Sequence, residues 1–177
     1  MTAHLRLSPV TTGTWAVDGS RTRITFTVGH LRGEVAGSLT LGRGEVVVDA
    51  SGAPVHASAA IDLGSLDTGV ARRDADLRKP RFLDSDRTPT MTWTADGFRR
   101  GEAGEWTADG VLSLRGTSAA LPVRATPEPV GTDGDGLRIR GTAVLDRTSI
   151  GIRAPRFVIG REVRIEVDAW LTRTAQD

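Results

Sequence analysis

The chain has 177 residues, enough for one sizeable hydrophobic core and few for two. Hydrophobic residues make up 38% and charged residues 25%, which is ordinary for a globular domain. The 23 basic and 22 acidic residues are interleaved, so no basic run predicts binding to nucleic acid or to an anionic lipid surface. Cysteine is absent, which excludes disulfides, thiolate metal sites and a cysteine nucleophile.

The first residues show no targeting signal. Arg6, Ser8 and Pro9 interrupt the first ten residues, so no secretory apolar run is visible. No later window approaches the ~20 apolar residues that a membrane-spanning helix needs. We therefore expect residues 1–12 to form an N-terminal extension, the protein to be cytoplasmic, and no stable membrane insertion.

Apolar and polar residues alternate along most of the chain, which is the period of a strand with one apolar face. In chain order the alternating positions are Trp15 and Val17; Ile24, Phe26 and Val28; Leu39 and Leu41; Val46 and Val48; Ala57, Ala59, Ile61 and Leu63; Met91 and Trp93; Trp106, Ala108, Leu112 and Leu114; Leu121, Val123 and Ala125; Leu137, Ile139, Ala143 and Leu145; and Val163, Ile165, Val167, Ala169 and Leu171.

Turn sequences rich in glycine and aspartate separate these runs, as at residues 42–44, 101–104 and 132–136. Asp109-Gly110 fits either a hairpin turn or a bulge inside a strand. About eight or nine strands joined by short turns imply one antiparallel barrel or sandwich. Small inward residues would leave room for a ligand in a barrel, or allow two sheets to pack closely in a sandwich. They are Ala57, Ala59, Gly110, Ala125, Gly141, Ala143 and Ala169.

One charged segment, about residues 67–79, breaks the alternation and predicts a short helix that caps the β-structure. Asp67 or Thr68 can cap the start of this helix. Asp74 and Arg78 have the i,i+4 spacing of an ion pair. Because so short a helix is marginal alone, we expect it to dock on the body of the protein. The docking side chains would be Leu66, Val70 and Leu77.

No constellation of side chains predicts catalysis, a metal site or a cofactor. His4, His30 and His56 are too far apart to form a local metal motif, and residues 133–136 lack the later glutamate of a calcium loop. Nucleophile-elbow, phosphate-loop and dinucleotide motifs are missing from the sequence. We expect a protein that is not an enzyme and has no cofactor. Two alternatives are an enzyme using scattered groups such as His30, Asp67 and Asp74, and a filled barrel with an interaction role.

Several motifs occur in a specific order between residues 13 and 173. They read WAVD at 15–18, ITFTVGH at 24–30, IDLGSLDTG at 61–69, FLD at 82–84, PTMTW at 89–93, GVLSLRG at 110–116 and DRTSIGI at 146–152. This pattern resembles the YceI-like family of lipocalin-like, polyisoprenoid-binding barrels. The chain departs from the family at Asp76, where histidine is usual, at Leu83, where a second phenylalanine is usual, and at Arg115, where histidine is common.

The resemblance implies an all-β fold, a single eight-stranded antiparallel lipocalin-like barrel over residues 13–173 with a short helical cap around 67–79. It also implies an interior that holds a long apolar lipid: a polyisoprenoid, a quinone-like molecule or a fatty-acyl lipid. We therefore expect a soluble carrier, and an exposed sheet edge could pair two subunits as a homodimer.

The expected ligand site combines the inward apolar positions with the cap. We expect the cavity to be lined by Phe26, Val28, Leu39, Leu41, Ile61, Met91, Trp93, Leu112, Leu114, Val123, Ile139 and Ile165. The residues expected to close or border the mouth are Leu66, Val70, Leu77, Phe82 and Leu83. The residues expected to contact a ligand head group are His30, Arg73 and Arg78.

Overall fold

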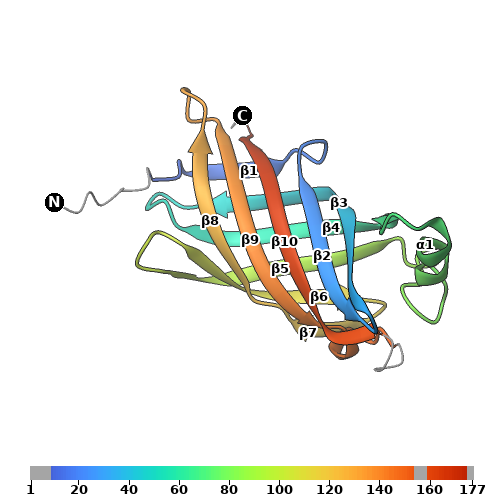
Figure 1. Ribbon diagram of the computed structural model, residues 1–177. Coiled ribbons are helices and arrows are strands. Elements are labelled where there is room, and N and C mark those ends of the chain that lie inside the picture. The colour runs from blue at the N-terminus through green and yellow to red at the C-terminus, as the bar shows by residue number, and fades with distance from the viewer. Residues whose placement is uncertain (1–8, 154–158, 175–177) are drawn as a thin grey trace.

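The computed structural model describes residues 9–153 and 159–174, in which antiparallel strands form one sheet closed into a barrel (Figure 1). The elements are β1 (Gly13–Val17), β2 (Arg23–His30), β3 (Gly33–Val48), β4 (Pro54–Asp67), α1 (Ala71–Leu77), β5 (Thr90–Arg100), β6 (Trp106–Leu114), β7 (Thr117–Ala120), β8 (Val123–Val130), β9 (Gly136–Asp146), a 3₁₀ turn η1 (Arg147–Ile150) and β10 (Ile159–Arg173).

The barrel has eight strand positions around its circumference. At two of these positions, two short strands lie end to end in place of one long strand. β1 and β2 both lie between β10 and β3 and follow one another along the barrel. β7 and β8 pair with β6 in one continuous register, in which Thr117 faces Leu114 and Val123 faces Ala108. Pro122, which has no N–H to donate, lies between them. The eight-stranded antiparallel barrel predicted from the sequence is confirmed, and each of the eight positions pairs with the position that follows it in the chain.

Strand β6 shows how the alternating sequence produces an inner and an outer face. Trp106, Ala108, Leu112 and Leu114 are buried, whereas the residues of the other parity are exposed or half-buried. Gly110 shares the inner parity, so Asp109-Gly110 lies inside the strand. The pairing of β5 with β6 shifts register on the opposite strand at this point, between Ala95 and Gly97. The dipeptide is therefore not a hairpin turn, and the extra residue of the bulge is Asp96 on β5, opposite Asp109-Gly110.

The two ends of the barrel differ. At the helix end, defined by the turn from His30 to Gly33, the segment 68–89, the turn at residues 115–116 and η1, the chain crosses from β4 to β5 through α1 (Figure 1). At the closed end, where β1 and β6 begin and β10 finishes, seven apolar side chains pack into one buried cluster. They are Val10, Trp15, Val48, Trp106, Leu137, Ala169 and Leu171. Val10 comes from the segment before β1, so the last residues of the N-terminal extension pack against the barrel.

The helix lies within the predicted segment 67–79 but is shorter, because Val70 has an extended backbone (φ −127°, ψ 106°) and no side chain caps the helix. The expected capping by Asp67 or Thr68 is therefore wrong. Asp74 is the buried side chain of α1, and its carboxylate accepts hydrogen bonds from the backbone N–H (3.1 Å) and hydroxyl (2.5 Å) of Thr68. The expected ion pair between Asp74 and Arg78 is also wrong, since Arg78 donates to the carbonyl of Leu66 at 2.9 Å.

Candidate ligand cavity

The interior of the barrel contains a cavity of about 680 Å³ with an almost entirely apolar wall. All eight positions around the barrel contribute side chains to this wall. The inward parity of each strand supplies them, which is why the alternating sequence produces a hydrocarbon-like interior. The volume falls within the range of about 300–1,000 Å³ that is typical of pockets for a single small molecule.

Most of the residues that we predicted to bind ligand lie in this wall or at its mouth. Those in contact with the cavity are Phe26, Val28, His30, Leu39, Leu41, Ile61, Leu66, Leu77, Phe82, Leu83, Met91, Trp93, Leu112, Val123, Ile139 and Ile165. The structure places two predicted residues elsewhere. Leu114 is 1% exposed and packs in the core beside the cavity, and Val70 is 47% exposed and precedes the helix. Of the predicted head-group residues, Arg73 lines the cavity, while Arg78 binds backbone carbonyls.

Several wall residues were absent from the predicted site although the sequence carried their signal. Leu145, Val163 and Val167 line the cavity and share the inward parity of their strands. The small inward residues Ala57, Ala59, Ala125, Gly141, Ala143 and Ala169 also contact it. Their short side chains leave the space that larger residues would fill. The prediction that small inward residues mark a cavity therefore agrees with the structure at these positions.

Two glycines allow aromatic rings to lie flat against the wall. The indole of Trp93 covers Gly110, where an added Cβ would approach the ring to 2.2 Å, and its Nε1 donates to the carbonyl of Leu121 at 3.0 Å. The ring of Phe26 covers Gly37 in the same way, with an approach of 2.4 Å. Because each ring occupies the space of a missing side chain, it lines the cavity without crossing it.

Polar side chains are concentrated where the cavity meets the helix end. Arg73, Asp76, Lys79 and Arg81 come from α1 and the residues after it, and His30 ends β2. Hydrogen bonding to the ammonium of Lys79, 2.7 Å away, lowers the pKa of Asp76 below its ordinary value. The mouth therefore places fixed charges beside an apolar interior, an arrangement suited to a ligand with a long apolar tail and a polar head.

The charged groups closest to the cavity are held by structural hydrogen bonds. Arg73 donates from Nε to the hydroxyl of Thr68 at 2.8 Å and from Nη2 to its carbonyl at 2.9 Å. Arg147 is buried and donates to the carbonyls of Ile152, Ile159 and Gly160. The guanidinium of Arg73 thus stabilises the cap, and that of Arg147 stabilises the start of β10.

The groups considered for catalysis do not form a paired constellation. Asp74 is bonded to Thr68, and the carboxylate of Asp67 accepts from the backbone N–H of Gly69 at 2.8 Å. Within residues 9–153 and 159–174, no cluster of histidine and acidic side chains is arranged to hold a metal ion. The helices in this part of the chain are also too short or too polar to span a bilayer.

Solved structures with the same fold cover most of the chain. BcnA from Burkholderia cenocepacia has a TM-score of 0.75 at 15% sequence identity, over 87% of this chain and 98% of that one. A polyisoprenoid-binding domain from Saccharophagus degradans, described as implicated in plant cell wall breakdown, has a TM-score of 0.69 at 13% identity, over 90% and 98% of the two chains. The YceI protein of Campylobacter jejuni has a TM-score of 0.66 at 17% identity, over 80% and 86%.

These identities are low, so the structural likeness concerns the fold. No curated protein sequence gives a significant match. Family membership rests on the sequence model of the YceI-like domain, which matches residues 15–171 and so spans the barrel from β1 to β10. The resemblance noted in the motifs is confirmed, and the chain belongs to the YceI-like family.

Proposed function

We propose that this protein is a carrier that holds one long apolar lipid, such as an isoprenoid-like molecule, inside the barrel and performs no chemistry on it. The observation that carries the proposal is the apolar cavity of about 680 Å³ that reaches the helix end and finishes at a packed closed end. The binding described for the S. degradans domain of the same fold supports a ligand of this class.

Burial of the apolar tail supplies enough binding free energy without a hydrogen bond or ion pair to the ligand. Each methylene moved from water into such an interior contributes about 0.8 kcal/mol. A tail of several isoprene units would therefore bind tightly even after the loss of its conformational freedom. The presence of a continuous cavity argues against the alternative of a filled barrel. The residues that the structure describes hold no paired catalytic groups that would favour an enzyme. The cytoplasmic location and the homodimer stay predictions from the sequence.

Native mass spectrometry of the purified protein, followed by solvent extraction, tests this proposal directly. We expect a one-to-one adduct, and extracted lipids whose masses differ by isoprene units. Added prenyl lipids should also change the fluorescence of Trp93 and Trp106, because both indoles line the cavity. Failure to find an adduct, together with no uptake of prenyl, quinone or fatty-acyl lipids, would contradict the carrier function.

A matched pair of variants on β9 separates binding in the cavity from binding to the surface. Ala143 faces the cavity, and the next residue, Val144, points outward and is 57% exposed. Ala143→Phe should fill part of the cavity and abolish or strongly weaken uptake, at a cost of about 1–3 kcal/mol in stability. Val144→Phe should leave uptake unchanged. Conversion of the bound lipid to a new product by the wild-type protein would instead establish an enzyme.

A further inference from the structure

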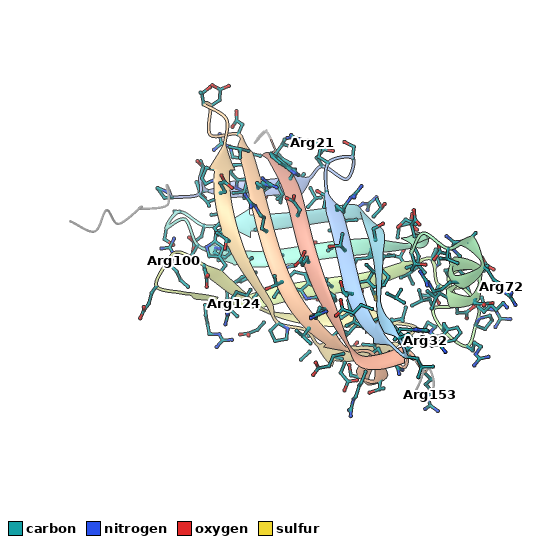
Figure 2. The ribbon with its side chains drawn as sticks, viewed as in Figure 1. Arg21, Arg32, Arg72, Arg100, Arg124 and Arg153 are labelled. Atoms are coloured by element: carbon teal, nitrogen blue, oxygen red, sulfur yellow. The ribbon has the colours of Figure 1, made fainter. Side chains whose placement is uncertain are left out.

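Folding gathers basic side chains that are dispersed in the sequence. Arg32 lies in the turn between β2 and β3, Arg72 lies on α1, and Arg153 follows η1. Figure 2 shows all three at the helix end of the barrel, whereas Arg100 and Arg124 lie away from it. The three arginines at the helix end are exposed and have no ion pair within the described parts of the chain. The helix end therefore presents uncompensated positive charge that no single basic run revealed.

Exposed apolar side chains accompany these arginines. Leu31, next to Arg32, is 65% exposed, the largest value among the exposed large hydrophobic residues of the described chain. Val70 is 47% exposed and lies two residues before Arg72. Apolar side chains beside arginine are the combination that enters the interface between water and an anionic bilayer, where the apolar groups are buried and the cations meet phosphate.

Three acidic side chains at this end are held in ion pairs. Asp76 pairs with Lys79, Glu34 pairs with Arg164, and Asp146 pairs with Arg161. Because these ion pairs are neutral, the unpaired arginines make the electrostatic potential at this end positive. Other carboxylates at this end have no ion pair within the described residues: Asp62, Asp67, Asp84, Asp86 and Glu162. They keep the attraction moderate, so it should be sensitive to salt.

We propose that the helix end is a docking surface for anionic lipid bilayers, with Leu31 and Val70 entering the interface and Arg32, Arg72 and Arg153 binding lipid phosphates. Docking in this orientation places the mouth of the cavity against the membrane. A ligand could then pass between bilayer and barrel without exposing its tail to water. The surface itself is argued from its own side chains; its use in lipid exchange rests on the proposed carrier function.

Vesicle co-sedimentation tests the surface. The probes are vesicles of phosphatidylcholine alone and of phosphatidylcholine mixed with phosphatidylglycerol. We expect wild-type protein to bind the mixed vesicles at low salt, to bind the neutral vesicles much more weakly, and to be released as salt rises. Arg32→Glu combined with Arg153→Glu should weaken binding by at least about fivefold per arginine. The matched control, Arg100→Glu with Arg124→Glu, has the same charge change away from the helix end and should bind like wild type.

Leu31→Ser and Val55→Ser form the apolar pair, since Val55 is 43% exposed on β4, outside the helix end. Only Leu31→Ser should weaken vesicle binding. Equal losses in the two double arginine variants, or no binding of wild-type protein to the mixed vesicles, would overturn the docking surface. Prenyl-lipid uptake measured without vesicles should be the same in all these variants. Vesicle binding without any lipid uptake would refute the carrier function while leaving the docking surface in place.

Discussion

The closed end and the helix end of the barrel are held together by different forces. At the closed end, Trp15, Val48 and Leu137 are at most 2% exposed and pack behind Trp106 and Leu171, which face the cavity. This end therefore resembles an ordinary hydrophobic core. It stabilises the barrel and closes the cavity at this end.

At the helix end, the segment 68–89 is held mainly by hydrogen bonds. The buried side chain of α1 is a carboxylate, Asp74, and Arg73 and Arg78 fasten the segment to backbone carbonyls of Thr68 and Leu66. The buried apolar side chains at this end, such as Leu66, Leu114 and Ile150, belong to the strands and to η1, and residues 68–89 add no buried apolar side chain. This segment should therefore open at a lower free energy than the strands. The closed end is thus stabilised by apolar packing, whereas the cap at the helix end is attached by polar contacts that can open at a lower cost.

The largest effect is expected from Trp106→Ala at the closed end. Removing this 4% exposed indole should cost about 3–5 kcal/mol in the free energy of unfolding, because it leaves a cavity in a packed cluster. It should also deepen the ligand cavity, so that the preferred tail length increases. Urea denaturation and competition between prenyl lipids of different lengths measure the two effects.

Trp170→Ala is the matched control for that variant. The ring of Trp170 lies on the outer face of the barrel between the guanidinium groups of Arg21 and Arg138, 4.1 and 4.8 Å from its centroid. Its removal should destabilise the protein less than the loss of Trp106 and leave the preferred tail length unchanged. A shift in tail length for the outer variant, or none for Trp106→Ala, would show that the closed end does not limit the ligand.

An intermediate effect is expected from Asp74→Ala at the helix end. Two hydrogen bonds from Thr68 would lose their acceptor, which should weaken the attachment of α1 by about 1–3 kcal/mol. Because the strands keep their packing, global unfolding should change less than local opening. We expect faster hydrogen exchange over residues 71–77 and faster release of bound lipid.

The control for the helix is Asp76→Ala, which removes a carboxylate from the same helix. The side chain of Asp76 is 51% exposed and pairs with Lys79, so its loss should have little effect on hydrogen exchange over the helix. If both variants accelerate exchange equally, the buried hydrogen bonds of Asp74 are not what holds the cap.

The sequence was sufficient to predict the barrel walls but not the end structures. Alternating residues such as those of β6 have the same period in a barrel and in a sandwich, and the family resemblance decided between them. The inward parity then located most of the cavity wall. It could not show that Gly110 faces the ring of Trp93, because this contact depends on the register between β5 and β6.

Spacing along a helix was less informative than spacing along a strand. Asp74 and Arg78 have the spacing of an ion pair, yet each has a stronger local alternative: Thr68 for the carboxylate and backbone carbonyls for the guanidinium. In the same way, the surface of Arg32, Arg72 and Arg153 combines residues from a turn, from α1 and from the segment after η1. Tertiary contacts of this kind leave no periodic signal in the sequence.

The smallest predicted effect is a pH dependence that compares one carboxylate on the barrel wall with one on the cap. Two hydrogen bonds from the guanidinium of Arg138, at 2.8 and 2.7 Å, hold the pKa of Asp168 below its ordinary value, and Lys79 does the same for Asp76. A lowered pKa in the folded state adds stability above the ordinary pKa, and this stability is lost as the pH falls through the folded value.

Urea denaturation between about pH 5 and pH 1 should therefore show declining stability in the wild type. Asp168→Asn should be less stable than wild type at neutral pH, and the two curves should converge in acid, where the native carboxyl is protonated. Asp76→Asn should follow the wild-type curve more closely, because both members of its ion pair are more than half exposed and solvent screens their interaction. A larger acid-dependent difference for Asp76 than for Asp168 would mean that charge pairing on the cap, and not on the barrel wall, governs stability in acid.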